Sequence, residues 1–196
     1  RISSGWWKRR CAPGGSDVER LWAGWRMAYV APERGRTKKK KGPARKAKDD
    51  CLFCRVGSRT PAGENLVLAV SPLALVMLNL YPYNVGHVMV APRRHLASPA
   101  GLDPDEAAEV NAWLGRVVEA LRREYRPQGF NLGANLGRTA GAGIPGHLHW
   151  HVVPRWNGDT NFMPVLGETK VLPEALERTY QRVKKALDSE SRRRAR

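Results

Sequence analysis

The segment GHLHWHVVPRW, at residues 146–156, constrains the fold of this chain more than any other stretch. Three of the five histidines of the chain occupy every second position in it, namely His147, His149 and His151, and apolar residues lie between them. Successive side chains of a β-strand point to opposite faces of its sheet. The segment therefore predicts a strand with three imidazoles on one face and apolar side chains on the other.

Three interpretations of these imidazoles are open. In the simplest one, histidine happens to form the polar side of a half-buried strand, although Ser, Thr, Lys or Glu fill such a face more commonly. In the other two, the imidazoles form a three-histidine metal site, or one of them is a nucleophile that its neighbours assist. Repulsion between adjacent imidazolium charges lowers the pKa of each ring, which favours the neutral form that both functions need.

A glycine-rich loop, GRTAGAGIPG at 137–146, leads directly into the histidines. Glycines such as Gly141 and Gly143 let the backbone approach a ligand closely and turn N–H groups toward it, as in loops that cradle phosphate. A phosphate bound there would lie beside the imidazole face. The loop therefore favours a histidine nucleophile acting on a phosphate over a three-histidine metal site.

The rest of the folded part predicts an α+β fold with a mostly antiparallel sheet. A long helix is expected to begin at Asp103, because Glu106 completes a capping box, and to end before Pro127. A C-terminal helix is expected over about 173–187. β-rich runs predict further strands at 66–70, 74–80, 87–92 and 130–136.

The net charge of +16 lies mainly at the two ends of the chain. Residues 1–50 hold 15 Lys/Arg against 5 Asp/Glu, whereas the central part is nearly neutral. A basic chain suggests nucleic acid as a partner, but here only the basic tails favour such contact. We predict a disordered extension at 1–17, an arm packing on the domain at 18–35, a basic flexible linker at 36–48, the folded domain at 49–187 and a basic tail at 188–196.

Two further features bear on the class of protein. The chain has no apolar run long enough to span a membrane and no secretory signal, so a cytoplasmic location is expected. Its three cysteines, Cys11, Cys51 and Cys54, argue against a disulfide framework. The two-residue spacing of the last pair lets both thiolates meet one tetrahedral metal ion, although a pair alone is only half of such a site.

HLHWHVV is similar to the His-φ-His-φ-His-φ-φ signature of the histidine-triad (HIT) superfamily of nucleotide hydrolases and transferases, where φ is apolar. The resemblance extends from about Leu21 to Leu187 and includes the segments NLYPYNVGH, PRRH and NLGRTAGAG. The arm LWAGWRMAYV and the segment WNGDTNF resemble the bacterial branch of diadenosine tetraphosphate phosphorylases more than the short phosphoramidase branch. The resemblance implies the HIT-like fold.

The resemblance also implies catalytic roles. His149 would attack the α-phosphate and form a covalent nucleotidyl-histidine, which an acceptor then resolves. His151 would contact the phosphate and assist the leaving group. His87 matches a further family histidine that packs near the nucleophile.

The nucleotide-binding positions that the resemblance implies lie on three segments. Asn79 matches the residue that binds the ribose hydroxyls, and Asn135, Gly141 and Gly143 match the phosphate-binding strand and loop, with His151. Eukaryotic members carry a polar residue where this chain has Gly143, so a backbone N–H, Thr139 or Arg138 is expected to replace that contact. As alternatives, Asn79 simply ends a strand and Asn135 is a turn residue.

His95 and His147 match the positions that complete a zinc site with Cys51 and Cys54 in related bacterial members. Zinc would be structural here, with no open coordination position. The alternative is two buried cysteines and an exposed His95.

The resemblance implies an enzyme that converts diadenosine tetraphosphate and phosphate to ATP and ADP. The first alternative is a HIT-family hydrolase of dinucleoside polyphosphates or nucleoside phosphoramidates, with water as the acceptor. The second is a non-catalytic module that binds nucleotides or RNA. Family members are commonly homodimers, so a homodimer is expected.

Overall fold

The computed structural model describes residues 51–57, 60–160 and 171–194. The segments predicted as the N-terminal extension, arm and linker, at 1–17, 18–35 and 36–48, lie outside the described residues. Their boundaries remain predictions.

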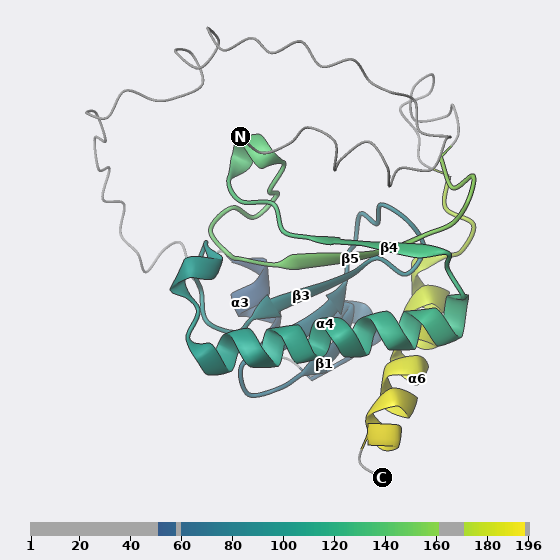
Figure 1. Ribbon diagram of the computed structural model, residues 1–196, viewed down its shortest axis with the longest axis horizontal. Helices are drawn as coiled ribbons and strands as arrows, with labels where there is room; N and C mark the ends of the chain where they lie inside the picture. Colours follow the sequence, from purple (N-terminus) through teal and green to yellow (C-terminus); the bar gives the residue numbers. More distant parts are fainter. Residues whose placement is uncertain (1–50, 58–59, 161–170, 195–196) are drawn as a thin grey trace, which may run out of the picture. The chain divides into compact units, whose positions relative to one another are not determined.

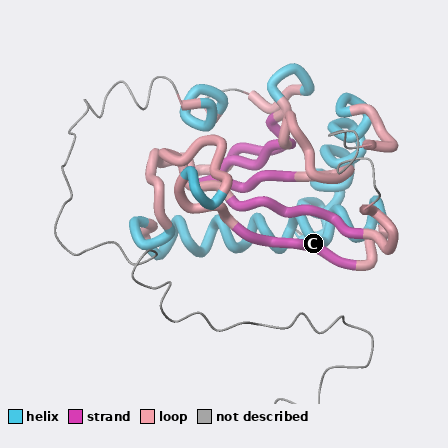
Figure 2. The backbone as a smooth tube through the Cα atoms, turned by 90° about the horizontal axis from the view of Figure 1, so that it is seen from above, coloured by secondary structure: helices cyan, strands magenta, loops and turns pink. Residues whose placement is uncertain are grey.

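Five strands form one antiparallel sheet in the order β1-β2-β3-β5-β4. The strands lie side by side (Figure 2), and a long helix, α4, runs along the sheet (Figure 1). The strands are Val67–Val70 (β1), Ala74–Leu78 (β2), Val88–Pro92 (β3), Gly129–Gly133 (β4) and Trp150–Arg155 (β5). The predicted α+β class and antiparallel sheet are confirmed, although the predicted strand ends were displaced by a few residues.

The histidine strand begins later than its alternation predicted. β5 starts at Trp150, which pairs with Val90, and the preceding residues have left the ladder. Continuing the register would place Leu148 opposite Pro92, which has no N–H to donate. The amide of Leu148 instead donates to the carbonyl oxygen of Leu96 at 2.6 Å. Only the third histidine of the triplet is therefore part of the strand.

The two predicted helices are present in the expected order, but not every end agrees, and the short helices of the described chain were not predicted. The capping box of Asp103 and Glu106 begins α4, which spans Pro104–Tyr125. The C-terminal helix α6 spans Leu176–Arg194, so it starts later than expected and continues past 187 into the predicted tail. Short helices are α3 (Leu52–Val56), η3 (Gly63–Asn65), η4 (Pro99–Gly101) and η5 (Arg138–Ala140). None of these helices within the described chain has the length and apolar composition that crossing a membrane requires.

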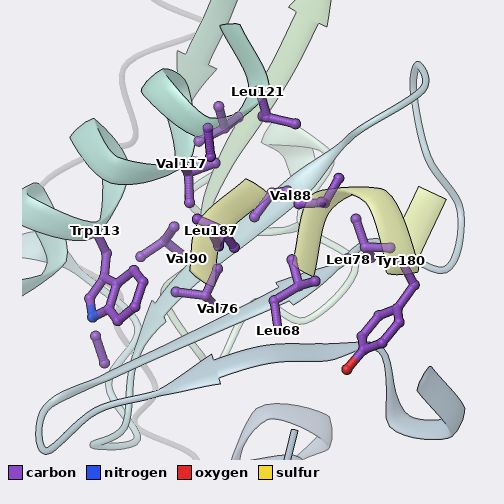
Figure 3. Close-up of a cluster of buried hydrophobic side chains, with 14 of the residues drawn as sticks. Leu68, Val76, Leu78, Val88, Val90, Trp113, Val117, Leu121, Tyr180 and Leu187 are labelled. Atoms are coloured by element: carbon purple, nitrogen blue, oxygen red, sulfur yellow. The ribbon is translucent and has the colours of Figure 1, made fainter. Parts of the chain in front are cut away.

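Alternation along the strands divides the buried side chains into two clusters, one on each face of the sheet. On one face, α4 and α6 cover the larger cluster (Figure 3), which includes Leu68, Val76, Leu78, Val88, Val90, Trp113, Val117, Leu121, Val152, Tyr180 and Leu187. On the other face, α3 covers a smaller cluster of Cys51, Phe53, Val56, Val67, Leu75, Met77, Met89 and Ala91. His151 pairs with Met89 and therefore lies on the α3 face. The helices α4 and α6 thus leave the imidazole face uncovered.

An ion pair fixes the connection between β3 and α4. Arg94 Nε donates to Glu106 Oε1 at 2.8 Å, and Glu106 Oε2 accepts the amide of Asp103 at 3.0 Å. The Glu106 side chain is almost fully buried, and the hydrogen bond from Arg94 lowers its pKa to about 2. This anchor lies directly before His95 in sequence.

The packing of α4 predicts a large effect of truncation at its buried face. Leu121→Ala removes a fully buried side chain and should lower the free energy of unfolding by about 2–5 kcal/mol. Asn111→Ala, at an exposed position of the same helix, should change it by less than about 0.5 kcal/mol. Urea unfolding followed by circular dichroism measures both values. Equal midpoints for the two variants would contradict the described core.

Candidate active site and metal cluster

A cavity of about 360 Å³ lies over the imidazole face of the sheet. Among the predicted site residues, Asn79, Gly141, Gly143, His149 and His151 line it. The remaining lining residues are Leu52, Phe53, Met77, Leu80, Tyr81, Tyr83, Met89 and Ile144. The cavity thus joins two imidazoles and the glycine loop to a largely apolar wall.

The neighbouring backbone fixes the tautomer of His149. Its Nδ1 lies 2.8 Å from the carbonyl oxygen of His147, and a carbonyl can only accept a hydrogen bond. Nδ1 therefore carries the proton, and Nε2 of the neutral ring keeps its lone pair. The side chain is buried, and burial lowers the pKa of His149, so the ring is neutral near pH 7. The result is an imidazole with a nucleophilic Nε2.

A chain of hydrogen bonds likewise orients His151. The amide of Tyr83 donates to His87 Nδ1 at 3.0 Å, so the proton of the neutral His87 ring is on Nε2. His87 Nε2 lies 2.9 Å from His151 Nδ1 and donates to it. The proton of His151 is consequently on Nε2, which is buried and has no hydrogen-bond partner among the described residues. The third triad histidine therefore holds an unused N–H donor at the cavity.

Burial keeps both of these rings neutral. It lowers the pKa of His87 to about 3, with further contributions from the charges that His151 and His149 would carry. Burial and the neighbouring His149 lower the pKa of His151 to about 4. The tautomers assigned above therefore hold near pH 7. His87 is not a lining residue of the cavity but contacts three residues that are, namely His151, Tyr83 and Asn79.

The two predicted asparagines occupy different environments. Asn79 lines the cavity; its Oδ1 accepts the amide of Tyr81 at 3.0 Å, and its Nδ2 lies 3.4 Å from His87 Nδ1. Asn135 does not line the cavity but lies against the loop, where a Cβ added to Gly141 would be 3.8 Å from Asn135 Nδ2. Gly141 has φ +87°, a left-handed conformation that favours glycine. Asn135 is therefore placed to support the loop.

The four predicted metal ligands form one cluster. Cys51, Cys54, His95 and His147 each offer a ligand atom within 4.8 Å of all the others. His147 Nε2 donates to the carbonyl oxygen of Pro92 at 2.8 Å, which leaves the lone pair of Nδ1 facing Cys51 Sγ at 3.3 Å. Nδ1 of His95 lies 3.3 Å from Cys54 Sγ.

The donor set of this cluster fits a tetrahedral soft metal ion. Two thiols and two imidazole nitrogens at this spacing are the ligands that zinc prefers in closed structural sites. His95 is half-buried within the cluster, which contradicts the alternative in which it is simply exposed. His147, the first triad residue, therefore belongs to this cluster rather than to the cavity.

Several residues of the site were not predicted from the sequence. The ring of Tyr83 stacks on His151, with centroids 5.5 Å apart, and its amide orients His87. The apolar wall comes mainly from α3, β2 and β3, which pack together in the fold. The segment YPYN next to His87 was a usable signal for Tyr83, whereas no local pattern marks the wall.

Comparisons with known proteins agree with this geometry. The HIT domain family model matches residues 62–158. The AP-4-A phosphorylase of Mycobacterium tuberculosis is 40% identical over 163 residues, which cover 83% of this chain and 81% of that protein. The adenosine 5′-monophosphoramidase of Schizosaccharomyces pombe is 30% identical over 108 residues, covering 55% of this chain and 75% of that protein.

A solved structure resembles the fold described above. It is a zinc-bound histidine triad family protein from Mycobacterium smegmatis, with a TM-score of 0.59 and 26% identity, and the match covers 74% of this chain and 99% of that one. The fold, the triad and these relatives together show that the chain belongs to the HIT domain family.

Proposed function

We propose that this chain is an enzyme that converts diadenosine tetraphosphate and phosphate to ATP and ADP through a nucleotidyl group on His149. The observation that carries the proposal is the pair of oppositely protonated nitrogens at one cavity. His149 Nε2 has a lone pair, whereas His151 Nε2 holds a proton with no partner among the described residues. The similarity to the mycobacterial AP-4-A phosphorylase supports this choice of substrate.

In the first step, His149 Nε2 attacks the α-phosphorus, and the bond from that phosphorus to the bridging oxygen breaks. ATP leaves as its anion, and the Nε2–H of His151 donates a hydrogen bond that stabilises the negative charge growing on the bridging oxygen. The backbone N–H of Gly143 would donate to a phosphate oxygen, because the amides of Gly141 and Ala142 already donate to the carbonyl oxygens of Arg138 and Gly137. In the second step, a phosphate oxygen attacks the α-phosphorus of the adenylyl group and the P–N bond breaks. ADP and the neutral imidazole are released.

The cavity wall suits the nucleoside that remains on the enzyme. Leu52, Phe53, Met77, Met89 and Ile144 form an apolar surface on which an adenine ring would pack. Asn79 lies at the edge of this surface with a polar side chain for the ribose hydroxyls.

The alternative function is hydrolysis, in which water resolves the same nucleotidyl-histidine. The similarity to an adenosine 5′-monophosphoramidase favours this alternative. The two functions share His149 and the first step and differ only in the acceptor.

We also propose that Cys51, Cys54, His95 and His147 hold a structural zinc ion. The donor set and the spacing of the cluster support it. When bound, zinc would tie α3 and the end of β3 to the segment that carries the nucleophile.

A homodimer in the cytoplasm is the proposed form of the enzyme. β4 is an edge strand of the sheet, and its Leu132 is 50% exposed, as expected of a strand that pairs with a second copy. Contact with nucleic acid is proposed only for the basic tails.

The reaction products test the proposed function. Incubation of the full chain with diadenosine tetraphosphate should give ATP and ADP when phosphate is present and little product when it is absent. His149→Ala should lower turnover on the order of 10³-fold or more, because the nucleophile is lost, while AMP binding changes little. Chromatography of the products and calorimetry with AMP measure both quantities. ATP and AMP formed equally with and without phosphate would establish water as the acceptor, and full activity of His149→Ala would refute the covalent mechanism.

Metal analysis tests the zinc proposal. The purified chain should contain about one zinc ion per molecule, and Cys51→Ser should lower both the zinc content and the midpoint of thermal unfolding. Cys11→Ser is the matched control, since Cys11 is not one of the four proposed ligands, and should change neither. Absence of zinc from the unmodified chain, or equal losses in the two variants, would contradict the proposal.

A further inference from the structure

The carboxylate of Asp159, in the turn that follows β5, accepts several hydrogen bonds from described residues. It lies in the segment GDTNF, to which the proposed function gives no role, and its side chain is only 8% exposed. Its carboxylate accepts hydrogen bonds from Arg155 Nε and Nη2, the amide of Trp156, Thr160 Oγ1 and Asn84 Nδ2. Asp159 is not a lining residue of the active-site cavity. Any effect on the reaction must therefore pass through a neighbour.

Asn84 is the neighbour that leads toward the cavity. It is buried, and its Nδ2 donates to Asp159 Oδ2 at 2.9 Å and to the carbonyl oxygen of Pro154 at 3.2 Å. Both side-chain amide protons of Asn84 therefore bind groups at the end of β5 or in the turn that follows it. These two bonds attach the turn that contains Asn84 to the strand that carries His151.

The same turn determines the orientation of His87. The amide of His87 donates to the carbonyl oxygen of Asn84 at 3.2 Å, and the amide of Tyr83 donates to His87 Nδ1 at 3.0 Å. His87 Nε2 in turn donates to His151 Nδ1. A shift of the turn would weaken the bond that keeps the His151 proton on Nε2.

We propose that Asp159 is a positioning residue that, through Asn84 and the turn before His87, holds the Nε2 proton of His151 toward the leaving group. The inference rests on the proposed function, because it concerns the leaving group of the first step. Asp159 is not among the residues that line the active-site cavity, so it would act through Asn84. It fixes the register between the turn of residues 83–87 and β5, and Arg155 holds the carboxylate in place with two hydrogen bonds.

The test uses two substrates that share the adenylyl group but have leaving groups that differ in how strongly they depend on a hydrogen-bond donor. The p-nitrophenyl ester of AMP releases a stable phenolate that gains little from a hydrogen-bond donor, whereas an alkylamine phosphoramidate of AMP releases a strongly basic nitrogen that depends on such a donor and takes its proton from solvent. In Asp159→Asn, adenylylation of His149 should slow about tenfold or more with the phosphoramidate and less than about twofold with the ester. AMP binding should stay unchanged. Single-turnover kinetics measure each rate.

Ring-nitrogen NMR gives a readout that a purely structural role would not change. Signals of labelled histidine should show His151 protonated at Nε2 in the unmodified chain and a mixture of tautomers in Asp159→Asn. Asp188→Asn removes an exposed acid that pairs with Lys184 on α6 and serves as the matched control, with no change expected.

A second variant keeps the test valid if Asp159→Asn folds poorly. Asn84→Ala removes the other end of the same contact and should show the same selective loss, and the double variant should lose no more than either single one. Equal slowing of both substrates, or no slowing of either, would overturn the positioning role and leave the proposed function intact. An unmodified chain that forms no adenylyl-histidine from either substrate would refute both.

Discussion

The hydrogen bond from His149 Nδ1 to the carbonyl oxygen of His147 is the interaction on which the site depends. It leaves the lone pair of Nε2 at the cavity and fixes the plane of the ring. The acceptor carbonyl belongs to a residue whose own ring lies in the cysteine and histidine cluster. The nucleophile and the metal cluster are therefore consecutive parts of one short segment. A displacement of His147 changes both.

Burial adds the second condition for reactivity. In water, the imidazoles of His87, His149 and His151 would titrate near pH 6.5, and each ring would be partly charged at neutral pH. Here burial lowers the pKa of His87 to about 3 and that of His151 to about 4, so each ring holds one proton at a nitrogen that its partners determine. The site thus presents one acceptor and one donor without a net charge. Because the rings carry no charge, such a site would bind a phosphate anion through N–H groups that point toward it.

Much of the site was predictable from local sequence because its chemistry is concentrated in short motifs. The triad alternation and the glycine loop favoured a histidine nucleophile acting on phosphate, and the cysteine spacing suggested half of a metal site. The individual roles and the two further ligands came from the resemblance to the HIT superfamily. The cavity wall was not predictable, because Phe53 meets Met77 and Met89 only through the packing of α3 on the paired strands β2 and β3. The role of Asn84 also depends on a tertiary contact, with Asp159. The alternation gave the correct face for the histidines but the wrong start for their strand, since it carries no information about the partner strand.

The partner strand of β5 is β3, and its last residue, Pro92, helps to position the site. Pro92 cannot donate to a ladder, and the sheet opens at the point where it faces the triad segment. Its carbonyl oxygen accepts the ring of His147, and the carbonyl oxygen of His147 accepts the ring of His149. Because Pro92 has no amide hydrogen, two carbonyl oxygens that would otherwise pair strands instead orient the rings of His147 and His149. In this protein, an interruption of regular structure supplies the alignment that chemistry requires.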